Sequence, residues 1–152
     1  MTVERIFIRP LQASSQAEQE NVNVIADSGI VGDRYFGCQD EPGQNITFVE
    51  AEEIESFANE YGLAIDLSIT SRNVVTRGVR LNELVGREFL VGSLRFRGVE
   101  LCEPCLGLGE ALATANLPPP SVVKRWLRKG GLRAVALSTG ELSVGARFAS
   151  AA

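Results

Sequence analysis

Two cysteines three residues apart, Cys102 and Cys105, are the side chains of this sequence best suited to covalent or metal chemistry. A cysteine thiolate can act as a nucleophile, as a redox partner or as a ligand for a soft metal. The chain contains no histidine, which excludes Ser-His-Asp and Cys-His catalytic pairs and zinc sites that use histidine. Arginines, backbone amides or a bound metal would therefore have to activate any thiolate here.

The residues alone leave several roles open for the segment Cys-Glu-Pro-Cys. A structural zinc site needs four ligands, so Cys38, Cys102 and Cys105 would require a carboxylate as the fourth. A Cys-x-x-Cys redox pair is possible, although such a pair typically lies early in a βαβ unit and this one comes late in a β-rich chain. Free cysteines are also often small buried residues at strand ends. Cys105 differs from Cys102 in two ways. Pro104 restricts the backbone directly before it, and the backbone amides of the glycine-rich segment after it could stabilise a thiolate or another anion.

The basic residues are mostly arginine, thirteen of them against Lys124 and Lys129. Pyridoxal-phosphate enzymes hold their cofactor through a lysine, and both lysines fall in one stretch that we expect to be solvated. We therefore expect no pyridoxal phosphate on this chain. Arg133 is a candidate cofactor-binding residue, because Gly130 and Gly131 before it would let the backbone approach a phosphate closely.

Length and charge limit the class of protein. The 152 residues fit one domain, residues 1–152. A net charge of −4 argues against a nucleic-acid partner, and no apolar run approaches the roughly 18 residues of a membrane span. The N-terminal segment does not resemble a signal peptide, and an odd number of cysteines forms no disulfide framework. We therefore expect a cytoplasmic protein without a membrane partner.

The pattern of elements predicts a mostly β, α+β fold. Residues 3–8 alternate as in a strand, whereas residues 12–23 are polar and predict a loop. Thr47 and Glu50 have capping-box spacing before a helix that Gly62 would end. Several short β-rich segments follow, with a short helix after the cysteines and another after the prolines at 118–120. Residues 132–148 predict a closing hairpin with its turn at 138–140. Together these features predict a single closed β-barrel-like domain with two or three short helices.

Five segments, in this order, resemble the molybdenum cofactor sulfurase C-terminal (MOSC) domain family, in its small stand-alone bacterial type. They are GIVGDRYFG, GQNITFVEAEEIE, SRNVVTRGVRLNELVGREFLVG, GVELCEPC and GGLRAVALSTGELSVGARF. The resemblance covers about residues 29–148. Each segment is a weak signal alone, whereas five in order with compatible spacing are a strong one.

The resemblance implies a closed β-barrel core and a pocket for a molybdenum cofactor of the molybdopterin type. Cys105 matches the family's working cysteine, which implies that it ligates molybdenum through the cofactor or carries persulfide sulfur. The implied reaction is reduction of N-hydroxylated substrates, with electrons from a separate electron-transfer protein. The alternative is a non-catalytic carrier or adaptor that passes sulfur or cofactor to a partner molybdoenzyme. The five segments contain no match to the desulfurase domain of larger relatives, so we expect a separate sulfur donor to load the carrier.

The same resemblance implies a set of cofactor-binding residues. Arg72 and Asn73 match the family's Arg-Asn pair, and Arg34 matches the arginine of its Gly-Asp-Arg motif. Asp33 would orient Arg34 or bind pterin nitrogens, and Gln44 matches the glutamine of the second segment. A glycine precedes Gln44 where the family often has an arginine, so one anion contact is missing. Forked guanidinium donors suit a phosphate and a polar ring.

Overall fold

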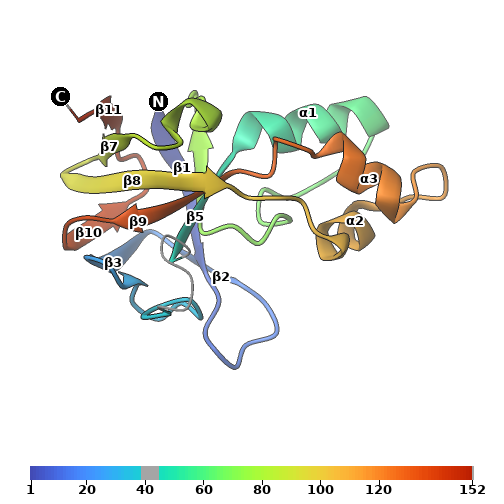
Figure 1. Cartoon of the computed structure of the whole chain (residues 1–152). Coiled ribbons are helices and arrows are strands. Elements are labelled where there is room, and N and C mark those ends of the chain that lie inside the picture. Colours follow the sequence, from blue (N-terminus) through green and yellow to red (C-terminus); the bar gives the residue numbers. More distant parts are fainter. Residues whose placement is uncertain (39–44, 152) are drawn as a thin grey trace.

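The computed structural model describes residues 1–38 and 45–151, and within them the chain is mostly β with three α-helices (Figure 1). The strands are β1 (Thr2–Ile8), β2 (Ala17–Gln19), β3 (Asn21–Ile25), β4 (Gly29–Ile30), β5 (Ile46–Glu50), β6 (Val74–Arg77), β7 (Glu88–Val91), β8 (Leu94–Leu101), β9 (Leu132–Ala136), β10 (Gly140–Ser143) and β11 (Phe148–Ser150). The helices are α1 (Ala51–Tyr61), α2 (Leu106–Leu112) and α3 (Pro119–Arg125), with a short 3-10 helix, η1 (Leu81–Leu84). None of the helices in the described ranges is long and apolar enough to cross a membrane.

Eight strands form one curled sheet in the order β11-β7-β8-β9-β5-β6-β1-β2. Its strand pairs are antiparallel except β5 with β6, which are parallel. The sheet is an open half-barrel with β11 and β2 at its edges, and an isolated bridge between Thr2 and Arg147 brings β1 near β11. The expectation of a mostly β fold is therefore confirmed, whereas a fully closed barrel is not.

A second, three-stranded sheet has the order β10-β3-β4. Two expectations were wrong. The predicted loop at residues 12–23 contains β2 and part of β3. The predicted hairpin at residues 132–148 does not form, because β10 pairs with β3 and not with β9. The segment between β9 and β10 bonds to other strands: the amide of Leu137 donates to the carbonyl of Arg95, and the Thr139 hydroxyl accepts from the amide of Ala26. These contacts carry the chain from one sheet to the other, so no hairpin forms.

Side chains on alternate positions build the core inside the curled sheet. In β8, Leu94, Phe96 and Gly98 are buried between more exposed neighbours, as a strand with one solvated face requires. Phe48 of β5 packs edge-on against Phe96 and against Phe89 of β7, with ring centroids 5.6 and 5.8 Å apart. The aromatic cluster packs β5, β7 and β8 against one another across the inside of the sheet.

The helices gather at one side of the curled sheet, away from β3 and β10 (Figure 1). They close a second core, in which Phe57 of α1 packs against Trp126 just after α3. Helix α1 ends at Gly62 with φ 64°, as expected. The predicted capping box is wrong, because Glu50 makes no side-chain cap bond and Thr47 lies inside β5.

Candidate functional site

The two close cysteines lie where β8 ends and α2 begins. Cys102 follows the last residue of β8, is 0% exposed, and donates its amide to the carbonyl of Gly131, 2.8 Å away. Cys105 is exposed and directly precedes α2, where its carbonyl accepts from the amide of Gly109 at 3.1 Å. Cys102 is thus part of the core, and the thiol of Cys105 is open to solvent.

Gly130 and Gly131 hold the cysteine segment against the start of β9. A Cβ added to Gly130 would meet the carbonyl oxygen of Cys102 at 2.5 Å. Gly131 has φ 106°, and a Cβ there would overlap the carbonyl oxygen of Phe48. Glycine at both positions therefore lets three backbone segments meet without side chains between them.

Arg72 joins this region from the segment that precedes β6. Its Nε donates to the carbonyl of Gly130 at 3.0 Å, and its terminal nitrogens make no hydrogen bond within the described residues. Burial raises the pKa of the Cys102 thiol, while the positive charges of Arg72 and Arg133 oppose this rise. Two of the predicted arginines therefore lie within electrostatic reach of Cys102 and of the loop that carries Cys105.

Arg133 lies in β9, beside the end of β8. Its NH1 is 3.8 Å from Oε1 of Glu100, and its side chain is 30% exposed. Its positive charge also favours the thiolate form of Cys102, which lowers the pKa of that thiol against the effect of burial. Arg133 is therefore engaged with protein groups, and its side chain is partly exposed.

Asn73 bridges strands, and its side chain is fully engaged with backbone and hydroxyl groups. Its Oδ1 accepts from the amide and hydroxyl of Thr47, both at 3.1 Å, and its Nδ2 donates to the carbonyl of Phe7 at 3.2 Å. Asn73 is only 3% exposed. The sequence interpretation did not predict that Thr47 would hydrogen-bond with Asn73. The only signal in the sequence was a polar residue within an otherwise apolar strand.

Asp33 and Arg34 form a separate turn after β4, and this turn contacts Arg9 just beyond the end of β1. Asp33 is 6% exposed, and its carboxylate accepts from the amides of Arg9 and Tyr35 at 2.9 and 3.2 Å. The guanidinium of Arg34 lies over the ring of Tyr35, 4.7 Å from its centroid. Within the described residues, neither side chain bonds to Arg72 or to a cysteine. Gln44, the remaining predicted residue, lies outside the described residues.

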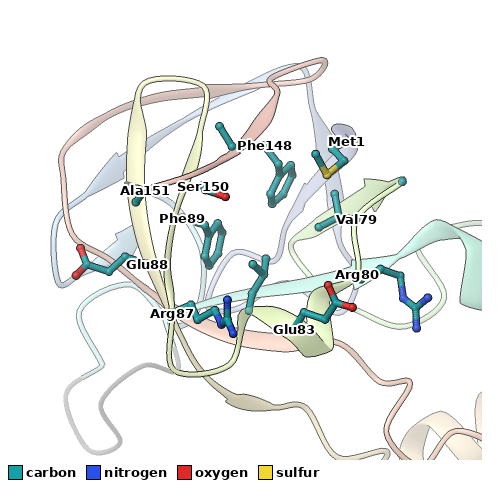
Figure 2. A pocket seen from close by; sticks show the side chains of 13 residues that line it. Met1, Val79, Arg80, Glu83, Arg87, Glu88, Phe89, Phe148, Ser150 and Ala151 are labelled. Carbon is teal, nitrogen blue, oxygen red and sulfur yellow. The ribbon is translucent and has the colours of Figure 1, made fainter.

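No cysteine lines either of two clefts in the described part of the chain. The larger, about 640 Å³, lies between η1 and the β7–β11 edge. Figure 2 shows Phe89 and Phe148 side by side within it, with Arg80 and Arg87 at its rim. The smaller, about 470 Å³, lies between the β1–β2 loop and the segment before β6. The larger cleft holds none of the predicted residues, so size alone does not identify the site.

Comparisons with known proteins agree with the fold. The model of the MOSC domain family matches residues 36–149. The YuaD protein from Bacillus subtilis has a similar structure, with 19% identity, a TM-score of 0.82, and coverage of 97% of this chain and 93% of that one. YiiM from Geobacillus stearothermophilus follows with 16% identity and a TM-score of 0.75, over 99% and 75% of the two chains. No curated protein sequence shows significant similarity. At these identities the structural likeness establishes the fold.

Proposed function

Because the chain belongs to the MOSC domain family, we propose that it binds a molybdenum cofactor of the molybdopterin type through Cys105. The observation that carries the proposal is the contrast between the two close cysteines: Cys105 is exposed, whereas Cys102 is buried. The segment that joins them runs against Gly130, the residue whose carbonyl holds Arg72. A cofactor or a partner can reach only an exposed thiol.

The donor set suits such a group. A thiolate is a soft ligand, which fits molybdenum and sulfane sulfur. Arg72 is held at Nε by the carbonyl of Gly130, so its remaining nitrogens form a preoriented fork for a phosphate or a pterin oxygen. Arg133 adds a second guanidinium near Cys102. When bound, the group would supply redox chemistry for reducing N-hydroxylated compounds, with electrons from a separate protein.

The other residues act by positioning. Burial raises the pKa of the Cys102 thiol, which keeps it protonated and a poor competitor of Cys105 as a ligand. The bonds of Asn73 to Thr47 and Phe7 fix the backbone beside Arg72. The bonds of Asp33 to two backbone amides fix the turn that carries Arg34.

A sulfur carrier is the second candidate, and the exposure of Cys105 favours it. The Cys105 thiolate would attack the outer sulfur of a persulfide on a donor protein. The sulfur–sulfur bond of the donor breaks, the donor leaves as a thiolate, and Cys105 holds the transferred sulfur as a persulfide. The exchange needs no external oxidant or reductant.

Production in a host that makes molybdopterin separates the two candidates. Molybdenum and pterin in a one-to-one ratio with the protein support the cofactor-binding function, and sulfane sulfur without metal supports the carrier. Absence of all three from folded protein would refute both.

Arg72→Ala should weaken pterin binding roughly tenfold to a hundredfold, because a charged hydrogen bond is lost. Arg125→Ala is the control, since Arg125 pairs with Glu60 on the helices.

A further inference from the structure

The smaller cleft has features of an anion site that the cofactor proposal does not use. It lies between the loop that joins β1 to β2 and the segment that precedes β6. Its lining includes Arg9, a group of paired charges at one end, and three serines whose hydroxyls make no hydrogen bond within residues 1–38 and 45–151. Arg72 and Cys105 do not line it.

The paired charges at one end neutralise one another in part. Arg5 donates to both carboxylate oxygens of Glu18, at 2.7 and 2.8 Å, and to Asp66 at 2.9 Å. Hydrogen bonds from Ser68 and Arg5 lower the pKa of Asp66 to about 2, so both acidic groups are ionised at neutral pH. Arg5 is therefore fully occupied and is not the group that would attract an anion.

Arg9 is a cation without a matching carboxylate. It forms no ion pair within the described residues, and its one side-chain bond runs from NH2 to the carbonyl of Ser14, 2.7 Å away. Its Nε is buried and has no hydrogen-bond partner. A partly desolvated guanidinium without a counter-charge is unfavourable, and an anion against its outer nitrogens would supply the charge partner that Arg9 lacks among the described residues.

Hydroxyl donors complete the cleft. In the described part of the chain, Ser15 makes no hydrogen bond, and Ser14 takes part only through its carbonyl. The hydroxyl of Ser71 is also unengaged, and this residue has φ 58°, which is uncommon for a residue with a side chain. Such backbone strain is typical of ligand sites. Neighbouring Thr70 has a buried hydroxyl without a partner.

We propose that this cleft binds a small phosphate monoester, with Arg9 as its charged anchor and the Ser14, Ser15 and Ser71 hydroxyls as donors. Several donors around one guanidinium match the several acceptor oxygens of a phosphate better than the two of a carboxylate. The carboxylates of Glu18 and Asp66 at the opposite end suit a ligand body that carries hydroxyl groups. A sugar phosphate meets both conditions. The proposal is independent of the cofactor proposal.

Titration of the ¹⁵N-labelled protein with ribose 5-phosphate tests the site, with ribose and inorganic phosphate as separate probes at constant ionic strength. We expect ribose 5-phosphate to shift the amide resonances of Ser14, Ser15 and Ser71, inorganic phosphate to do so more weakly, and ribose alone to have no effect. Arg9→Gln should weaken binding at least about tenfold, because the charged donor is lost. Arg97→Gln, an exposed arginine on β8, is the matched control and should bind as the wild type does.

Two results would overturn the proposal. One is equal affinity of the wild type and Arg9→Gln. The other is a loss in Arg72→Gln as large as that in Arg9→Gln, which would place the phosphate at the proposed cofactor site. If Arg9→Gln does not fold, Ser15→Ala tests the site instead, since Ser15 is exposed and makes no hydrogen bond in the described structure. Severalfold weaker binding of ribose 5-phosphate to Ser15→Ala supports the site, and unchanged binding refutes it. Molybdenum content should be the same in Ser15→Ala and the wild type. The phosphate titration and the molybdenum measurement therefore test the cleft proposal and the cofactor proposal separately.

Discussion

Cys102 and Cys105 are three residues apart, yet only Cys105 reaches solvent. The end of β8 carries Cys102 into the core against Gly131, and the chain then turns outward before α2. Burial raises the pKa of the Cys102 thiol even though Arg72 and Arg133 lie near it. Burial therefore outweighs the two nearby positive charges in setting the pKa of the Cys102 thiol.

Alkylation should separate the two thiols. In a Cys38→Ser background, iodoacetamide should modify Cys105 in the native protein and Cys102 only through local opening. If that opening costs about 3 kcal/mol, Cys102 should react on the order of a hundredfold more slowly. Mass spectrometry of peptides taken over time gives both rates in one sample. Equal rates in the folded protein would contradict the assignment of Cys102 to the core.

Glu50 should make stability depend on pH. Its pKa is raised from 4.5 to about 7, chiefly by partial burial and also by Glu53 and Glu52. A raised pKa stabilises the fold below pH 4.5, and that contribution is lost as pH rises through 7. Glu50→Gln should therefore unfold less readily than the wild type at pH 8, by on the order of 1 kcal/mol after allowance for solvent screening, with little difference at pH 4.

Urea unfolding of both proteins at pH 4, 6 and 8 measures this difference. Glu110→Gln, at an exposed position in α2, is the control and should track the wild type at every pH. A constant difference between Glu50→Gln and the wild type across this range would show that Glu50 titrates normally.

At the scale of elements, the site depends on how β5, β6 and β1 are joined. Asn73 precedes β6 and bonds to Thr47 of β5 and to the carbonyl of Phe7 in β1. Strands β5 and β6 are the parallel pair of the larger sheet. The side chain of Asn73 therefore ties three strands together next to Arg72.

Removal of this tie should destabilise the fold. Asn73→Ala leaves the Thr47 amide and the Phe7 carbonyl without their side-chain partner in a buried region. The expected loss is about 2–3 kcal/mol in the free energy of unfolding, since each buried unsatisfied group costs about 1–3 kcal/mol. Denaturant unfolding measures it, with Asn116→Ala at an exposed turn as the control. A loss equal to that of the control would contradict a structural role for Asn73.

Elements with strong local signals could be predicted from the sequence, and those that depend on distant partners could not. Alternating residues predicted β1, a β-rich segment between glycines predicted β8, and Gly62 predicted the end of α1. β3 was missed because its short Asn-Val alternation lies in a polar stretch and is stabilised by β10, more than a hundred residues away. The contact of Arg72 with Gly130 is likewise a tertiary one, so spacing alone could not reveal it.

At the scale of the whole molecule, the candidate site lies where the curled sheet meets the helices (Figure 1). The ends of β8 and β9 supply Cys102 and Arg133, while the segments around α2 and α3 supply Cys105 and Gly130. Both hydrophobic clusters border this junction: Phe48 of the first cluster pairs with Leu132 at the start of β9, and Trp126 of the second cluster packs against Phe57 of α1. The exposed thiol therefore projects from a rigid framework.

The molybdenum and pterin content of three proteins purified from a molybdopterin-producing host tests the central claim most directly. These are the wild type, Cys105→Ala and Cys102→Ala, each checked for folding by thermal melting. We predict bound molybdenum and pterin in the wild type, retention of most of both in Cys102→Ala, and loss of molybdenum in Cys105→Ala. Equal molybdenum in folded Cys105→Ala and wild type would contradict the claim that Cys105 is the residue that holds the cofactor.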